Sequence, residues 1–171
     1  MIKILFVCHG NICRSPMAEY VMKDLVSRAG REKEFQIASA AVSREEIGNP
    51  VYPPARRELA KHGISCEGHA ARQVTMKDYH HFDRIYYMDR SNARWLERML
   101  PKDPEKIRPL LSHDVADPWY TGDFRQTWGQ LHPAQAADGT WRHRPRTGGA
   151  GSGRCWRPYS KSDRSYEAHR G

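Results

Sequence analysis

The sequence predicts an α/β domain: a small, doubly wound fold in which helices cover both faces of a four-stranded parallel sheet. Two observations support this prediction. Short apolar runs alternate with amphipathic segments along the first 124 of the 171 residues, which is typical of strands connected by helices. The first run, at residues 4–7, is continuously apolar rather than alternating, which indicates a strand buried on both faces.

The individual elements follow from local signals. A strand is expected at residues 3–7, and apolar residues then recur at helical spacing from Ala18 to Ala29. Ser15 as N-cap, Pro16 in the first turn and Gly30 past the end mark the limits of this helix. Later segments predict strands at 35–39, 84–88 and 107–111 and helices at 54–62 and 91–100. In the helix at 91–100, the expected core residues are Trp95, Leu96, Met99 and Leu100.

Composition excludes several classes of protein. No apolar run approaches the roughly 20 residues needed to span a bilayer, and residues 4–7 are too short for a signal-peptide core, so we expect a cytoplasmic protein without membrane contact. The four cysteines, at positions 8, 13, 66 and 155, form neither a dense disulfide framework nor a paired Cys-x-x-Cys zinc site. We therefore expect reduced thiols, with Cys66 in the core and Cys155 exposed, and neither metal nor cofactor.

The composition changes after residue 124. Residues 1–124 carry 19 Lys and Arg against 17 Asp and Glu, whereas residues 125–171 carry 9 against 3, so most of the net charge of +8 lies in the second segment. Leu131 is the only Val, Ile, Leu, Met or Phe in that segment. We therefore expect an ordered domain at 1–124 and a disordered basic tail, rich in Gly, Arg and Trp, at 125–171.

The segment between the first strand and the first helix carries the clearest chemical signal. It reads Cys8-His9-Gly10-Asn11-Ile12-Cys13-Arg14-Ser15. A loop of this length before a helix can point successive backbone N–H groups inward, and with the helix N-terminus they form a cradle for an oxyanion of phosphate size. Such a position favours the thiolate of Cys8, and the planar guanidinium of Arg14 suits two phosphate oxygens. The sequence thus predicts a phosphate-binding loop that contains a nucleophile.

This loop resembles the signature Cys-x-Gly-Asn-x-Cys-Arg-Ser-Pro of the low-molecular-weight protein tyrosine phosphatases. Similar blocks follow in the family's order up to residue 124, at 39–43, 71–74, 88–92 and 114–120. The resemblance implies a hydrolase that acts on phosphotyrosine in proteins, and on small aryl phosphates, through a phosphocysteine intermediate. It implies Cys8 as the nucleophile, Arg14 as the ligand of the phosphoryl oxygens and Asp117 as the general acid and base.

The resemblance also implies a set of residues that support the loop. Asn11 would fix the shape of the loop, and Ser39 and His69 would brace Asn11. Ser15 would donate a hydrogen bond to the thiolate of Cys8 and help it leave.

Further residues are assigned to the pocket and to redox chemistry in the same way. His9, Trp119 and Tyr120 would form the pocket walls, and a deep aromatic slot selects phosphotyrosine because the shorter phosphoserine does not reach the thiolate. Cys13 would form a disulfide with Cys8 under oxidation, so we expect reversible redox inhibition.

Three alternatives fit the sequence less well. Arsenate reductases share the fold and the loop, but they need further cysteines after the third strand, and none lies between Cys66 and Cys155. Protein arginine phosphatases of this family carry Thr where this chain has Ile12, so we prefer phosphotyrosine as the substrate. A non-catalytic protein that binds nucleic acid through its basic tail is the third alternative. We expect a monomer without a nucleic-acid partner.

The chain departs from the family pattern after the segment of Asp117. The family normally ends with an amphipathic helix packed against the sheet, whereas here Gly129, Pro133, Gly139 and Pro145 interrupt the segment after residue 124. We therefore expect the final helix to be missing. Our hypothesis is that the tail is read out of frame, and the alternative is a genuine lineage-specific tail.

Overall fold

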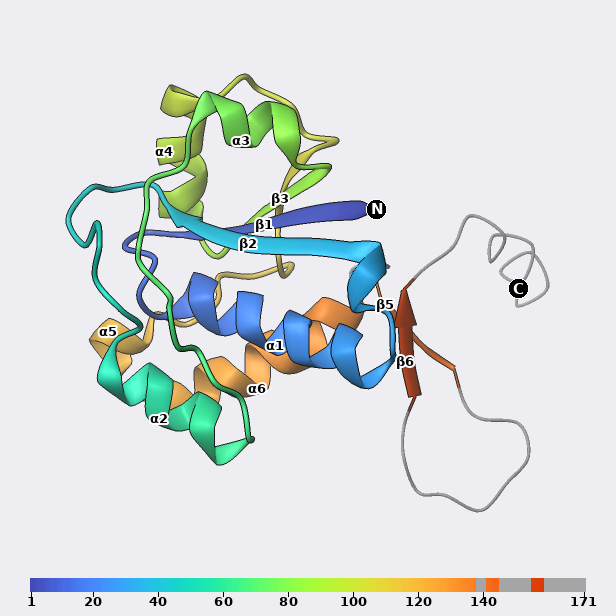
Figure 1. The fold of residues 1–171 in the computed structure, drawn as a ribbon. Helices are drawn as coiled ribbons and strands as arrows, with labels where there is room; N and C mark the ends of the chain where they lie inside the picture. The colour runs from blue at the N-terminus through green and yellow to red at the C-terminus, as the bar shows by residue number, and fades with distance from the viewer. Residues whose placement is uncertain (138–140, 145–154, 159–171) are drawn as a thin grey trace, which may run out of the picture.

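A four-stranded sheet lies at the centre of the molecule. The computed structural model describes residues 1–137, 141–144 and 155–158, with the side chains of residues 1–132 (Figure 1). The sheet has the order β2-β1-β3-β4, and all neighbouring strands are parallel. Its strands are β1 (Ile2–Cys8), β2 (Phe35–Ala41), β3 (Arg84–Tyr87) and β4 (Ile107–Pro109). Cys8 pairs with Ala41 and Val7 with Tyr87, so these strands end at one edge of the sheet.

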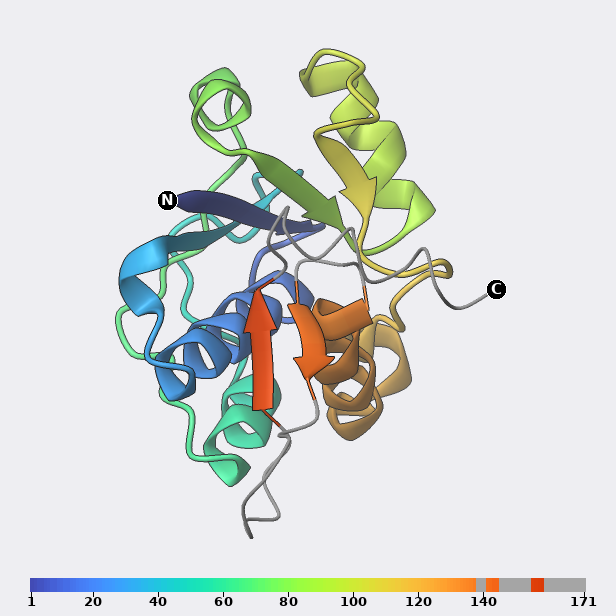
Figure 2. The same ribbon diagram turned by 90° about the vertical axis from the view of Figure 1, so that its right-hand side faces the viewer.

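Helices cover both faces of this sheet, as Figure 1 and, from the side, Figure 2 show. One face carries α1 (Arg14–Arg28), α2 (Pro53–Lys61), α5 (Pro118–Thr121) and α6 (Phe124–Ala137). The other face carries α3 (Met76–His81) and α4 (Arg90–Met99), and a short turn, η1 (Glu32–Glu34), leads into β2. The predicted doubly wound α/β fold is therefore confirmed.

The side chains of β1 explain why the sheet needs two helical layers. Ile4 and Phe6 belong to the buried cluster on the side of α1, whereas Leu5 and Val7 belong to the cluster on the side of α4. Successive side chains of a strand point to opposite faces, so the continuously apolar residues 4–7 of β1 must be covered on both. Cys8 ends this strand and lies in the first cluster, as does Cys66, which confirms Cys66 as a core residue.

The expected strands and longer helices end within two residues of the predicted positions, but three local expectations are wrong. The N-cap of α1 is Cys13 and makes no side-chain capping bond, whereas Ser15 is fully buried inside the first turn. Trp95 is 39% exposed and does not join the core. The six-residue helix α3 was not expected, although the capping box of Thr75 and Asp78 marks its start.

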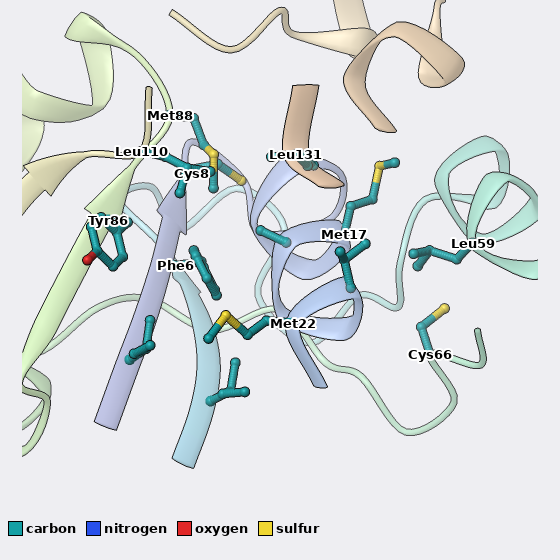
Figure 3. Close-up of a cluster of buried hydrophobic side chains, with 14 of the residues drawn as sticks. Phe6, Cys8, Met17, Met22, Leu59, Cys66, Tyr86, Met88, Leu110 and Leu131 are labelled. Carbon is teal, nitrogen blue, oxygen red and sulfur yellow. The ribbon is translucent and has the colours of Figure 1, made fainter. Parts of the chain in front are cut away.

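The last helix, expected to be missing, is present as α6. Phe124, Thr127, Trp128 and Leu131 lie at i, i+3, i+4 and i+7 and form one face of this helix. Thr127 and Leu131 are fully buried, and Leu131 lies in the same hydrophobic cluster as Phe6 (Figure 3). A two-turn stripe that includes a threonine is therefore enough to pack α6 on the domain, because α1 and the sheet supply the rest of the apolar surface.

Two of the four residues expected to interrupt the last helix, Gly129 and Pro133, lie within α6, whereas Gly139 and Pro145 lie outside the described residues. Gly129 is exposed, and a Cβ atom there would meet no atom within 4 Å. Pro133 has no N–H and so withholds a helical hydrogen bond from the Gly129 carbonyl, which water can replace on the exposed side of the helix.

A stack of aromatic rings joins α6 to α2. The ring of Trp128 lies on the ring of His62, at the C-terminal end of α2, with centroids 3.6 Å apart and planes 1° apart. The ring of His132, one turn further along α6, lies 5.4 Å from that of Trp128. Residues 125–132 therefore pack on the domain expected at 1–124.

Beyond α6 the structure describes two short strands. They are β5 (Trp141–Arg144) and β6 (Cys155–Pro158), which pair antiparallel. Disorder was expected from residue 125, but residues 125–137 belong to α6. The residues at 138–140, 145–154 and 159–171 and the side chain of Cys155 lie outside the described part, and the shifted reading frame stays a prediction. Within the described residues, no helix is long and apolar enough to cross a membrane.

Replacing two glycines by alanine tests the helical assignment of α6. Gly129→Ala should raise the free energy of unfolding by about 0.5–1 kcal/mol, because alanine is the better helix former and the added methyl has room. Gly122→Ala is the matched control: its methyl also has room, but its φ of 69° should make the change destabilising by about 1 kcal/mol. Urea unfolding measures both. A destabilising Gly129→Ala would contradict a helix at this position.

His132, one of the two histidines in the aromatic stack, should make the free energy of unfolding depend on pH. Burial, and next the neighbouring His62, lower the pKa of His132 below its usual 6.5. The unfolded chain therefore takes up a proton at higher pH than the folded protein, so the stabilisation is complete above pH 6.5 and is lost as the pH falls below it. Unfolding free energies measured from pH 8 to pH 5 should fall less steeply for His132→Gln. The control is His80→Gln, which alters an exposed histidine and should give a pH profile parallel to that of the wild type. A profile of His132→Gln that is also parallel to the wild type would contradict the prediction.

Candidate active site

The predicted phosphate-binding loop lies at the edge where the strands end. Cys8 is the last residue of β1 and Arg14 the first of α1, and the N–H groups of Val42 and Ser43 donate to the carbonyls of Cys8 and His9. The Cys8 side chain is only 3% exposed. Its Sγ accepts a hydrogen bond from the Asn11 N–H at 3.3 Å. It also lies 3.0 Å from the Ser15 hydroxyl. One backbone N–H and one hydroxyl group thus contact the sulfur.

Asn11 holds the loop in shape. Its φ of 59° makes it the only non-glycine residue in the left-handed region among those described, and asparagine tolerates this region better than most side chains. Its side-chain amide donates to Ser15 (2.8 Å) and Ser39 (2.9 Å), its carbonyl accepts from His69 Nε2 (2.8 Å), and its side-chain oxygen accepts from the Arg72 N–H. The structure therefore brings Asn11, Ser15, Ser39 and His69 together, as the sequence predicts.

The carboxylate of Glu19, on α1, extends the hydrogen-bond network around Asn11 through Ser39. Glu19 is buried, accepts a hydrogen bond from the hydroxyl of Ser39 and pairs with Lys23 at 2.6 Å. His69 Nδ1 lies 4.0 Å from the same carboxylate, so His69 connects Glu19 with the backbone of Asn11. The sequence analysis did not single out Glu19, which lies five residues after Arg14 on the buried side of α1.

Two carboxylates hold the guanidinium of Arg14, which is 2% exposed. One terminal nitrogen donates to Asp89 (2.6 Å) and to the Val115 carbonyl (3.2 Å), and the other donates to Asp117 (3.0 Å). Burial alone lowers the pKa of Arg14, but the facing Cys8, Asp117 and Asp89 raise it overall. The arginine therefore stays charged at the bottom of the site.

Asp117 reaches the loop from a segment 103 residues further along the chain. It is the N-cap of α5, where one carboxylate oxygen accepts from the Trp119 N–H (3.1 Å) and the other from Arg14. Its side chain keeps 25% of its surface exposed. The structure thus places the predicted acid beside the predicted nucleophile and cation.

A pocket of about 520 Å³ opens above these residues. The predicted wall residues His9, Trp119 and Tyr120 all line it, with Trp119 55% and Tyr120 85% exposed. The floor and lower walls include Cys8, Gly10, Ile12, Cys13, Arg14 and Asp117. An aromatic entrance above a cationic floor suits an aryl phosphate.

Cys13 also lines the pocket, but its environment differs from that of Cys8. It is 5% exposed and packs with Ile12 and Ala71. Burial, and next the neighbouring Cys8 and Asp117, raise the pKa of the Cys13 thiol well above its usual value. Cys13 therefore stays protonated.

Besides Glu19, the sequence analysis missed four further residues of this site. Asp89, the N-cap of α4, holds Arg14, while Glu45 and Glu46 form the wall beyond β2. Tyr52 lies behind Trp119 with ring centroids 5.1 Å apart, and its N–H donates to the Ile12 carbonyl. The available signal in the sequence was position: residues that directly follow parallel strands lie at the edge of the sheet where ligands bind, and this holds for Asp89, Glu45 and Glu46. No group of three or more potential metal ligands occurs among the described residues.

Comparison with known proteins decides the family. The sequence model described as "Low molecular weight phosphotyrosine protein phosphatase" matches residues 3–136, from β1 through almost all of α6. The chain belongs to this phosphatase family. The match includes the helix that the sequence analysis expected to be missing.

Two relatives of this phosphatase show how close the similarity is. The chain is 42% identical over 134 residues to the low molecular weight protein-tyrosine-phosphatase YfkJ of Bacillus subtilis, which covers 74% of this chain and 86% of that protein. It is also 42% identical over 138 residues to the low molecular weight phosphotyrosine protein phosphatase of Gallus gallus, covering 74% and 87%. These relatives are phosphatases, and the chain shares their class as a hydrolase.

Solved structures agree with the fold of the phosphatase. The crystal structure of YfkJ superposes with a TM-score of 0.76 at 39% identity and covers 78% of this chain and 89% of that one. The crystal structure of a Drosophila arginine phosphatase superposes with a TM-score of 0.71 at 31% identity, covering 78% and 92%.

The buried ion pair of the phosphatase yields a test of stability. Asp89→Asn keeps a good N-cap for α4 but removes one of the two charges that hold Arg14, so the free energy of unfolding should fall by about 1–3 kcal/mol. Urea unfolding measures the loss. Asp114→Asn is the control, because the exposed Asp114 accepts one surface hydrogen bond from the Arg90 N–H. Equal effects of the two substitutions would contradict a special role for the Arg14 pair.

Proposed function

We propose that this protein hydrolyses phosphotyrosine in proteins, and small aryl phosphates, through a phosphocysteine intermediate on Cys8. The observation that carries the proposal is the convergence of Cys8, Arg14 and Asp117 at the floor of one pocket. Phosphoryl transfer to a side chain requires a nucleophile, a fixed cation and an acid that face the same bound phosphoryl group, and all three residue types line this pocket.

In the first step the Cys8 thiolate attacks phosphorus. The loop N–H groups and Arg14 bind the equatorial oxygens, where negative charge accumulates in the transition state. Phosphate binding exchanges the contact between Arg14 and Asp117 for contacts with these oxygens, while Asp89 continues to hold the other nitrogen of Arg14. Asp117, released from Arg14, takes up a proton from solvent and then gives it to the departing phenolate oxygen.

In the second step water cleaves the phosphocysteine. Asp117, now ionised, takes a proton from the attacking water, and inorganic phosphate and the Cys8 thiolate are released. The Ser15 hydroxyl, 3.0 Å from Sγ and fixed by the amide of Asn11, stabilises this thiolate as it leaves. Asn11, Ser39 and His69 act by holding the loop in its strained conformation.

The pocket walls favour phosphotyrosine over phosphoarginine. Ile12 lines the pocket with an apolar side chain, and Trp119 and Tyr120 offer ring faces, all of which suit a phenyl ring. Because the fold is also similar to that of an arginine phosphatase, phosphoarginine is the alternative substrate to be tested. We expect kcat/KM to be higher for a phosphotyrosine peptide than for the matching phosphoarginine peptide. The reverse order would make the protein an arginine phosphatase.

We assign Cys13 the redox role that the family resemblance implies. Peroxide oxidises the Cys8 thiolate to a sulfenic acid, and the Cys13 sulfur then displaces its hydroxyl group as water to form a disulfide. The position of both thiols at one pocket supports this assignment. The near balance of charge in residues 1–124 argues against nucleic acid as a partner of the domain, while a monomeric state and a cytoplasmic location stay predictions.

Substitution of the nucleophile tests the proposed chemistry. Hydrolysis of 4-nitrophenyl phosphate near pH 6 should be abolished in Cys8→Ser, because an alcohol at this position is not ionised. Turnover that survives this substitution would overturn the phosphocysteine mechanism.

Substitution of the acid tests the second assignment. Asp117→Asn should lower kcat/KM for phenyl phosphate by about 10²–10³-fold, because phenolate is a poor leaving group without a proton. Asp114→Asn, which alters an exposed carboxylate outside the pocket, is the matched control. An Asp117→Asn enzyme as fast as this control would exclude Asp117 as the acid.

A further inference from the structure

Two side chains of α6 bond the backbone directly before Asp117. The N–H of Ala116 donates to the side-chain oxygen of Gln130 at 2.9 Å, and the hydroxyl of Thr127 donates to the carbonyl of Ala116 at 3.1 Å. Thr127 is fully buried and Gln130 partly buried. Both backbone groups of this one residue are therefore held by a single helix.

From this geometry we infer that Thr127 and Gln130 are positioning residues for the general acid. The inference rests on the proposed function of Asp117. The Ala116 carbonyl and the Asp117 nitrogen share one peptide plane, so the Thr127 hydroxyl fixes the plane from which the Asp117 side chain departs. Neither Thr127 nor Gln130 lines the pocket, so they act through Asp117 and not on the substrate.

The backbone around Ala116 shows why this support matters. Val115 is anchored on both sides, since its N–H donates to the Met88 carbonyl (2.8 Å) and its carbonyl accepts from Arg14 (3.2 Å). The side chain of Asp117 is held by Arg14 and the Trp119 N–H. When phosphate takes the Arg14 contact, the bonds from α6 are the fixed support that remains between Val115 and α5.

A small displacement of the acid has a large kinetic effect. A general acid must lie within about 2.6–3.2 Å of the oxygen that it protonates, and a shift of about 1 Å can cost as much as 10²-fold in rate. The penalty depends on the leaving group: phenolate needs the proton, whereas 4-nitrophenolate leaves readily without it. A displaced acid should therefore lower kcat/KM more for phenyl phosphate than for 4-nitrophenyl phosphate, whereas a general loss of folded protein lowers both values by the same factor.

The experiment compares two substrates in each variant of the full-length protein. Thr127→Val keeps the shape of the side chain but removes the hydroxyl, so kcat/KM should fall about tenfold for phenyl phosphate and less than about twofold for 4-nitrophenyl phosphate. Thr127→Ser, which keeps the hydroxyl, should restore the wild-type ratio of the two values. A ratio measured within one variant cancels any loss of folded protein.

Gln130 provides the second, independent variant. Gln130→Leu should shift the same ratio in the same direction, and it keeps the test decisive if Thr127→Val fails to fold. Gln126→Leu is the matched control, because Gln126 lies one turn earlier on α6 with an exposed side chain outside the pocket. It should leave the ratio unchanged.

The possible results separate the inference from the proposed function. Equal proportional losses on both substrates in Thr127→Val and Gln130→Leu would overturn the inference and leave the phosphatase assignment intact. A wild-type protein that hydrolyses neither substrate would overturn the proposed function, and the inference with it.

Discussion

The site depends on a buried positive charge. A guanidinium removed from water costs several kcal/mol unless opposite charges and hydrogen bonds replace its hydration. Arg14 satisfies this requirement with Asp89, Asp117 and a backbone carbonyl, each contributed by a segment that follows β3 or β4. The need to neutralise Arg14 therefore draws two distant loops to the end of β1. The pocket is the space that they enclose.

The parallel sheet makes this convergence geometrically simple. Because β1, β2 and β3 run in one direction, their carboxyl ends and the loops after them lie at one edge. Each strand end then contributes a different kind of group: the proposed nucleophile at the end of β1, the carboxylates of the wall after β2 and the ligand of Arg14 after β3. Helices on both faces keep this edge free for the substrate.

Local patterns predicted most of the fold, and long-range contacts decided the rest. Continuous apolar runs and helical spacing gave the strands and the longer helices, and the spacing of Cys8 and Arg14 gave the loop. The helix α6 was missed because Gly129 and Pro133 indicate an interruption and because the buried Thr127 counts as polar in a hydropathy pattern, although it bonds a carbonyl inside the domain. Asp89 and Tyr52 were missed because their importance lies in contacts with residues far away in the sequence.

The order of the chain gives the hydrogen bonds of α6 a consequence for biosynthesis. The nucleophile loop is translated first, whereas the acid and the helix that bonds Ala116 come from the last part of the folded domain. A nascent chain that ends before α6 holds the reactive thiol and its arginine but lacks the support for the proton donor. On the proposed mechanism, the general acid is therefore fully supported only after α6 has been synthesised and has packed on the domain.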